Sequence, residues 1–283
     1  MRVSVGDVQL YIHEAGPADG GGRPLIVLHG GPGLDGSFWF PGLAPLAAEG
    51  WRVLAPDLRG NGRSDAGYVD KWTVPQMADD IEMLIDVLNL ERTVIVGQSF
   101  GSFVAQSHMA RHGSATAYVL MATVAHPGAL AGIDDELDRF MPVSLRAQVT
   151  ASWMCEASVE TAEEARQLWH DQIPFHVADP EGPLVAQLAR DDVTVFRPEV
   201  LRHFAAGGDY GMEDLRGQLR DFRKPVLVLS GEHDRTTSPA SAHELAQLLP
   251  YGKESVIPDA AHLMLYEQPE ATLDALRAFL RWV

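Results

Sequence analysis

Several features that would direct this sequence toward other classes of protein are missing or scarce. Its 283 residues contain one cysteine, Cys155, so no internal disulfide can form, which agrees with a reducing compartment. No apolar run approaches the roughly 18 residues that a membrane span requires, and no hydrophobic signal region follows Arg2. We therefore expect a cytoplasmic protein that makes no membrane contact.

Basic residues and phosphate-binding motifs are scarce as well. Only 22 Lys and Arg residues oppose 39 Asp and Glu residues, giving a net charge of −17, so we expect no nucleic-acid partner. Neither G-x-x-x-x-G-K-[ST] nor a G-x-G-x-x-G that opens a helix occurs, which argues against a phosphate-cradling loop. The hydrophobic content of 46% is enough for a sizeable core. The sequence does not decide between a monomer and a homo-oligomer.

Short apolar runs make up the predicted sheet. Residues 3–16 have the pattern of an N-terminal hairpin. Six further candidate strands follow: PLIVLHG, RVLAPD, TVIVGQS, AYVLMAT, PVLVLSG and ESVIPDA. They lack polar alternation, which is typical of parallel strands buried on both faces.

Helical periodicity separates these runs. After the second of the six, apolar residues recur three or four positions apart, with Thr73 as the expected N-cap and Pro75 early in the helix. Residues 269–283 have the same period. The pattern predicts an α/β fold, a mostly parallel eight-stranded sheet flanked by helices.

A long interval interrupts the alternation. Residues 126–223 contain helical patterns and no convincing buried strand, which is far more chain than one crossover needs. We interpret them as a helical cap inserted into a core of residues 1–125 and 224–283. The expected place of the cap is above the carboxyl ends of the strands, where open α/β sheets bind ligands.

Ser99 is the candidate nucleophile. Residues 97–101 read Gly-Gln-Ser-Phe-Gly, directly after a strand and before a helical run, as a nucleophile elbow requires. Glycines two positions before and after the serine let the backbone turn tightly and expose the hydroxyl. The five-residue pattern is common by chance, and its strand–turn–helix setting is what favours catalysis over a merely structural turn.

A serine nucleophile needs a base that a carboxylate orients, and in hydrolases with such an elbow the chain order is Ser, acid, His. Asp234 follows the strand PVLVLSG, and His262 follows the last strand, ESVIPDA. Other candidates remain poorer choices: His233 and His243 for the base, and Glu232 and Asp259 for the acid.

Acyl transfer also needs hydrogen-bond donors for the oxyanion. One should be the backbone N–H of Phe100, and the second should come from the loop at residues 29–33, His-Gly-Gly-Pro-Gly. Pro32 has no N–H, which leaves the glycines of this loop.

Taken together, these motifs carry a family resemblance. HGGPG at 29–33, D-x-R-G-x-G-x-S at 57–64, GQSFGS at 97–102, GEHD at 231–234 and the late Ala-His resemble the α/β-hydrolase family, and HGGPG resembles its proline iminopeptidase branch. The resemblance covers nearly the whole chain outside the cap. It implies the α/β-hydrolase fold, with Gly31 as the second oxyanion donor.

The sequence also departs from the iminopeptidase branch. The branch reads D-Q-R-G where this chain has Leu58, and often has Trp where this chain has Phe100. Related aminopeptidases bind the substrate amine with glutamates at two positions where this chain has Arg235 and His203. A cation and an imidazole at these places would disfavour an ammonium ligand. Cap acids could replace the glutamates, although solvated surface is their plainer interpretation: Glu156, Glu164 and Asp209.

The sequence therefore predicts a serine hydrolase of a small, mainly apolar acyl substrate, an ester, lactone or amide, that works without metal or organic cofactor. Trp153 in the cap, with His203 and Arg235, is expected to bind substrate. Two alternatives remain: an aminopeptidase of the iminopeptidase type, and a ligand-binding receptor with a vestigial triad.

Overall fold

One mixed sheet forms the centre of the molecule, in a computed structural model that describes residues 1–17 and 21–283. Its strands are β1 (Arg2–Val5), β2 (Val8–Ala15), β3 (Arg23–Leu28), β4 (Trp51–Pro56), β5 (Val94–Gln98), β6 (Ala117–Met121), β7 (Val226–Gly231) and β8 (Gly252–Ile257). They lie in the order β1-β2-β4-β3-β5-β6-β7-β8. β1 and β2 form the predicted antiparallel hairpin, β2 pairs antiparallel with β4, and β3 to β8 run parallel.

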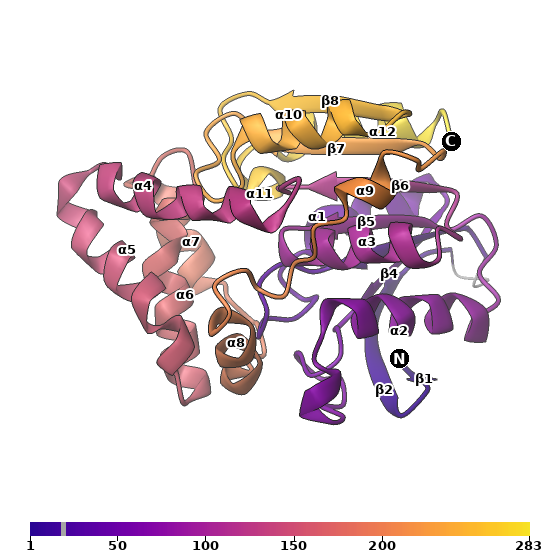
Figure 1. Ribbon diagram of the computed structural model, residues 1–283, viewed down its shortest axis with the longest axis horizontal. Coiled ribbons are helices and arrows are strands. Elements are labelled where there is room, and N and C mark those ends of the chain that lie inside the picture. The colour runs from indigo at the N-terminus through magenta and orange to yellow at the C-terminus, as the bar shows by residue number, and fades with distance from the viewer. Residues whose placement is uncertain (18–20) are drawn as a thin grey trace.

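Helices cover both faces of the sheet (Figure 1). Outside the interval between β6 and β7 they are α1 (Phe40–Leu43), α2 (Val74–Val87), α3 (Phe100–Arg111), α10 (Pro239–Leu248), α11 (Met264–Glu267) and α12 (Pro269–Leu280), with 3-10 turns η1 (Ala44–Glu49) and η2 (Val69–Lys71). Successive strand residues point to opposite faces, so Ile26 packs with the α2 and α3 side and Val27 with the α1 and α12 side. The predicted eight-stranded, mostly parallel sheet flanked by helices is confirmed (Figure 1).

Local signals in the sequence explain how α2 begins. The Thr73 side chain accepts a hydrogen bond from the Gln76 N–H at 3.2 Å, and Pro75 lies in the first two helical positions. A capping side chain satisfies a backbone donor that has no partner within the helix. The N-cap that the sequence predicts is therefore present.

One expectation about the strands is wrong. β8 was expected to be buried on both faces like the other parallel strands, yet most of its residues are exposed or half-buried. The reason is its place at the edge of the sheet, where β7 is its only partner among the described strands. An edge strand has a neighbouring strand on one side only. The hydrophobicity of its sequence does not distinguish such a strand from a central one.

Between β6 and β7 the chain is helical, as the sequence indicates. It forms α4 (Gly132–Arg139), α5 (Val143–Cys155), α6 (Ala162–His176), α7 (Pro183–Arg190), α8 (Pro198–Ala205) and α9 (Arg216–Leu219), with 3-10 turns η3 (Pro127–Ala131) and η4 (Glu156–Ser158). Figure 1 shows α4 to α8 gathered at one end of the molecule, beside the sheet. Helix α9 instead packs against α3.

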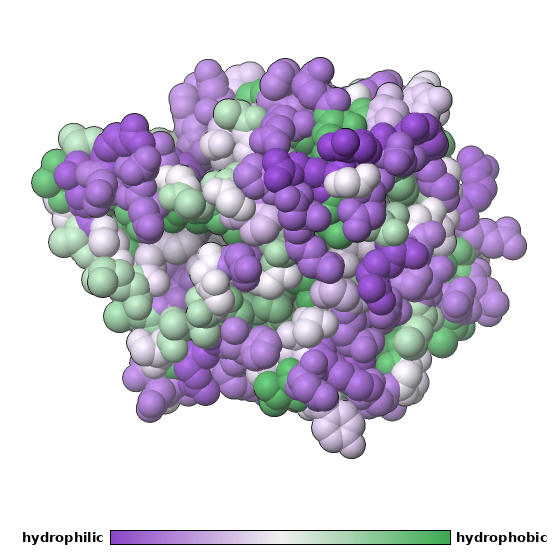
Figure 2. All heavy atoms as spheres, viewed as in Figure 1, coloured by the Kyte–Doolittle hydropathy of each residue, from purple (hydrophilic) through white to green (hydrophobic). Residues whose placement is uncertain are grey.

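The surface in view is mostly hydrophilic over the sheet (Figure 2). Hydrophobic residues gather at the outer tip where α4 meets α5, and the exposed side chains of this connection include Met141 and Val143. Within residues 1–17 and 21–283, no helix combines the length and the apolar character that crossing a lipid bilayer demands.

Candidate active site

Ser99 stands on a sharp turn between β5 and α3. Its backbone angles are φ 50° and ψ −119°, a conformation that side-chain-bearing residues rarely adopt. A Cβ on Gly97 would collide with the backbone of Gly101, and one on Gly101 would collide with the Leu28 carbonyl. Only glycine fits at either position, so these two glycines allow the strained turn that holds Ser99.

His262 and Asp234 form a buried pair next to this turn. His262 Nδ1 lies 2.9 Å from Asp234 Oδ2, and both side chains are almost completely buried. The Thr237 hydroxyl donates to the same Asp234 oxygen at 2.7 Å, while the backbone N–H groups of Thr236 and Thr237 donate to Asp234 Oδ1 at 2.8 and 2.9 Å. The carboxylate therefore fixes the orientation of the His262 ring.

The electrostatics of Asp234 favour its charged form. Burial would raise the pKa of Asp234, but the charge and hydrogen bond of His262 and the hydrogen bonds of Thr237 outweigh burial, and the pKa is lowered. An ionised carboxylate at Nδ1 keeps the proton on that nitrogen. His262 Nε2 is then free to accept a proton from a nearby hydroxyl.

Ser99 and His262 line one cavity together with Thr236 and Thr237. In the described part of the chain, no hydrogen bond joins Ser99 Oγ to the His262 ring. Such bonds are often long in proteins without substrate and tighten in the substrate complex. The remaining candidates lie elsewhere: His243 pairs with Glu254 on the surface, and His233, Glu232 and Asp259 are exposed.

The loop after β3 brings backbone N–H groups to the same cavity. Gly31, at φ 61°, and Phe100 both line it, and neither N–H is a donor in any hydrogen bond found among the described residues. Behind the loop, buried His29 accepts the Leu58 N–H on Nε2 at 3.0 Å and has Nδ1 3.1 Å from the Gly30 carbonyl. This places the proton of His29 on Nδ1 and anchors the loop from inside.

The cavity has a mainly apolar wall. The wall includes Phe103, Leu130, Ile133, Trp153, Leu168 and Trp169. Trp153 is thus where the sequence analysis expects it.

Arg235 and His203 do not line the cavity, and the expectation that they face substrate is wrong. Arg235 Nη1 donates to the backbone carbonyls of Val177 at 2.8 Å and Phe175 at 3.3 Å, at the end of α6. His203 Nε2 lies 2.8 Å from the Trp72 carbonyl. Unpaired carbonyls at a helix end attract a cation, so Arg235 turns toward α6 rather than toward the cavity.

Two polar residues of the cavity wall are Glu156 and His176. The plainer interpretation of Glu156 from the sequence, as a cap acid on the solvated surface, is wrong, and the sequence does not identify His176 as a site residue. Glu156 is buried, and it accepts hydrogen bonds from Gln172 Nε2 at 2.8 Å and from the Tyr210 hydroxyl. Burial raises the pKa of Glu156 against the opposing effect of both hydrogen bonds. His176 ends α6 and packs against His262. Its position in the apolar run around Phe175 was the available signal of a buried histidine.

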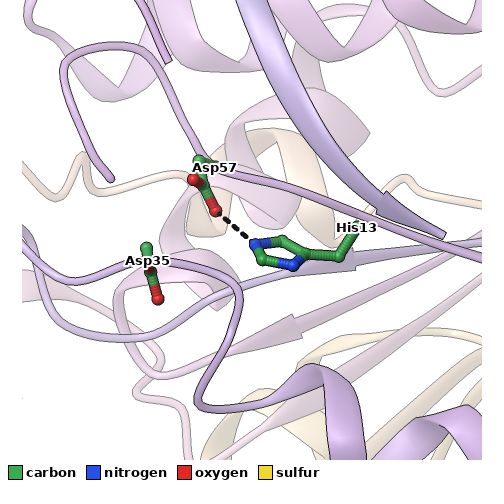
Figure 3. Close-up of side chains that lie close together, drawn as sticks. All are labelled: His13, Asp35 and Asp57. Atoms are coloured by element: carbon green, nitrogen blue, oxygen red, sulfur yellow. Dashed lines mark hydrogen bonds and ion pairs between the residues drawn. The ribbon is translucent and has the colours of Figure 1, made fainter. Parts of the chain in front are cut away.

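His13, Asp35 and Asp57 form a cluster with the composition of a metal site (Figure 3). Asp57 accepts hydrogen bonds from the backbone N–H groups of Gly36 and Arg63, each at 2.8 Å, and its Oδ1 lies 3.1 Å from His13 Nε2. The Arg63 guanidinium donates to Asp35 at 2.7 Å. A cation and N–H donors thus already occupy these carboxylates, which join the loops after β3 and β4.

The chain belongs to the α/β-hydrolase family. A family model described as alpha/beta hydrolase fold matches residues 23–269. The fold, the strand–turn–helix at Ser99 and this match agree with one another.

Known relatives extend over nearly the whole chain. The AB hydrolase superfamily protein YisY of Bacillus subtilis is 27% identical over 275 residues, 93% of this chain and 92% of its own length. A proline iminopeptidase of Lactiplantibacillus plantarum is 26% identical over 284 residues, 96% of both chains. The solved structure of a thermophilic esterase from Thermogutta terrifontis covers 100% of this chain and 98% of its own, with a TM-score of 0.75 and 25% identity.

Proposed function

We propose that this protein is a serine hydrolase that cleaves a small acyl substrate through an acyl-enzyme on Ser99. The observation that carries the proposal is the strained turn of Ser99 in one cavity with the buried His262–Asp234 pair. Relatives named as an esterase/perhydrolase and as an enol-lactonase, 25% and 26% identical, add support.

Five residues act in the proposed reaction. His262 Nε2 takes the proton of the Ser99 hydroxyl while Ser99 Oγ attacks the acyl carbon, and Asp234 stabilises the imidazolium that forms. The N–H groups of Gly31 and Phe100 hold the oxyanion. His262 then gives its proton to the leaving group, which completes acylation.

The mainly apolar wall supports an apolar acyl group as substrate. We propose further that residues 126–223 act as a cap, because Trp153, Leu168 and Trp169 in this interval contribute part of that wall.

A second candidate function, cleavage of substrates with a free amine, is favoured by Glu156. This residue is a carboxyl in the cavity wall, and its hydrogen-bond partners among the described residues include no cation. A buried carboxylate attracts an ammonium group strongly. Arg235 and His203 do not line the cavity, so neither side chain lies against a substrate bound there.

A parallel kinetic screen tests both candidates. Wild-type protein and the Ser99→Ala variant are assayed with p-nitrophenyl acyl esters, lactones, and proline and alanine p-nitroanilides. We expect ester or lactone turnover in the wild type and a loss of about 10⁴-fold or more in Ser99→Ala. Preference for the anilides, removed by Glu156→Gln, would favour the aminopeptidase. Ligand-induced stabilisation without any turnover would favour the receptor.

A further inference from the structure

His176 is a second histidine in the cavity to which the proposed mechanism assigns no role. It is the last residue of α6, its side chain is buried, and it lines the cavity together with Ser99 and His262. The centroids of the His176 and His262 rings lie 5.0 Å apart, with an angle of 34° between the ring planes. The two imidazoles are therefore neighbours in the cavity wall.

Both rings are oriented by the same loop. His262 Nδ1 is bound to Asp234, and His176 Nδ1 lies 3.0 Å from the hydroxyl of Thr236, two residues further along. Nδ1 and Nε2 point in different directions from an imidazole ring, so each Nε2 is turned away from this loop. Across the described residues, His176 Nε2 has no hydrogen-bond partner.

His176 stays neutral in this environment. Burial lowers the pKa of His176 well below its ordinary value, and positive charge on His262 lowers it further, against the opposing effect of Asp234. Because the Thr236 hydroxyl can donate to Nδ1 or accept from it, either neutral tautomer can form. His176 Nε2 can accordingly donate a hydrogen bond to water or accept one.

We propose that His176 is a further catalytic residue, whose Nε2 holds the water that hydrolyses the acyl-enzyme while His262 Nε2 activates it. The inference rests on the proposed function. With the ring centroids 5.0 Å apart and both rings in the wall of one cavity, a single water can lie within hydrogen-bond reach of both Nε2 atoms.

The step is balanced in atoms and protons. His262 Nε2 takes a proton from the water, and the water oxygen forms a bond to the acyl carbon. The bond from the acyl carbon to Ser99 Oγ then breaks, and His262 returns the proton to Ser99 Oγ as the carboxylic acid leaves. His176 neither gains nor loses a proton, and acylation does not need it, because no water reacts in that step.

Stopped-flow kinetics with p-nitrophenyl acetate separates the two steps. His176→Phe keeps an aromatic ring in the packing and removes both nitrogens. We expect its deacylation rate constant to fall about tenfold or more while the acylation rate constant changes less than about twofold. A burst of about one p-nitrophenolate per active site should follow, and His176→Gln, whose amide can bind water, should restore part of the deacylation rate.

The matched control is His170→Phe, a histidine of the same helix whose Nε2 pairs with Asp192 outside the cavity. Its acylation and deacylation rates should both equal those of the wild type. Equal losses in both steps for His176→Phe, or no loss in either, would overturn the inference. The proposed function fails separately, if the wild type releases no p-nitrophenolate beyond that of Ser99→Ala.

Discussion

The loops at the ends of β5, β7 and β8 and the helices between β6 and β7 both contribute to the cavity, but in different ways. The loops supply Ser99, Asp234 and His262, and backbone geometry positions these residues: a strained turn, and hydrogen bonds from backbone N–H groups to Asp234. The helices supply Glu156 and His176, whose direction depends on side-chain packing.

The comparison teaches which sequence signals can be trusted. A residue at the end of a parallel strand has a place that the sheet dictates, so motif and chain order suffice to find it. For a residue on an inserted helix, the sequence predicts which face of the helix it occupies but not which element that face packs against. Arg235 shows that this limit also holds next to a strand end, because it follows Asp234 directly and yet turns to the carbonyl groups at the end of α6.

The largest effect should come from the acid of the loop region. Asp234→Asn keeps the shape of the side chain but removes the charge that selects the His262 tautomer, so we expect kcat/KM for p-nitrophenyl esters to fall about 10⁴-fold. The measurement is steady-state kinetics, with circular dichroism as a control for folding. Activity within tenfold of the wild type would show that Asp234 does not orient the base.

Two glycine substitutions, one at the turn after β5 and one in the helices between β6 and β7, compare how strongly each place constrains the backbone. Gly101→Ala puts a Cβ against the Leu28 carbonyl and should cost about 3 kcal/mol of unfolding free energy, whereas Gly217 in α9 has open space around it. Gly217→Ala should stabilise by up to about 1 kcal/mol through helix propensity. Urea unfolding measures the unfolding free energy of both variants. Equal changes in this free energy would show that the turn at Ser99 does not require glycine at position 101.

Acid should destabilise the folded protein through His108, which joins α3 to the Tyr118 hydroxyl of β6. Burial, opposed by Glu82, lowers the pKa of His108 to about 4, and its ring nitrogens face the Tyr118 hydroxyl and Glu82. An unfolded histidine binds its proton near pH 6.5, so between these values the unfolded state holds more protons and stability falls as pH falls. The contribution is about 3 kcal/mol at most.

Urea unfolding from pH 7 to pH 4 measures this dependence. In His108→Gln the part of the slope between pH 6.5 and pH 4 that comes from His108 should disappear. An unchanged slope in the variant would show that folding does not lower the pKa of His108.

The smallest effect concerns the contact between the two regions. Arg235→Met removes the hydrogen bonds to Phe175 and Val177, so unfolding free energy should fall by about 1–2 kcal/mol. The ratio of ester to anilide hydrolysis should stay within about twofold of the wild type, because Arg235 does not line the cavity. A large change in that ratio would show that Arg235 does help to select the substrate.

Much of the fold could be predicted from the sequence, because buried parallel strands and the N-cap at Thr73 leave local patterns. Ser99 and the His262–Asp234 pair were also brought together as the motifs indicate. The exposure of β8, the direction of Arg235 and the burial of Glu156 could not be predicted, because each depends on which elements become neighbours.

Mass spectrometry of a rapidly quenched reaction with a p-nitrophenyl ester tests the central claim most directly. The account predicts an acyl adduct on the peptide that contains Ser99 in the wild type, accumulating further in His176→Phe, and no adduct in Ser99→Ala. An adduct on another residue, or turnover in Ser99→Ala at the wild-type rate, would contradict it.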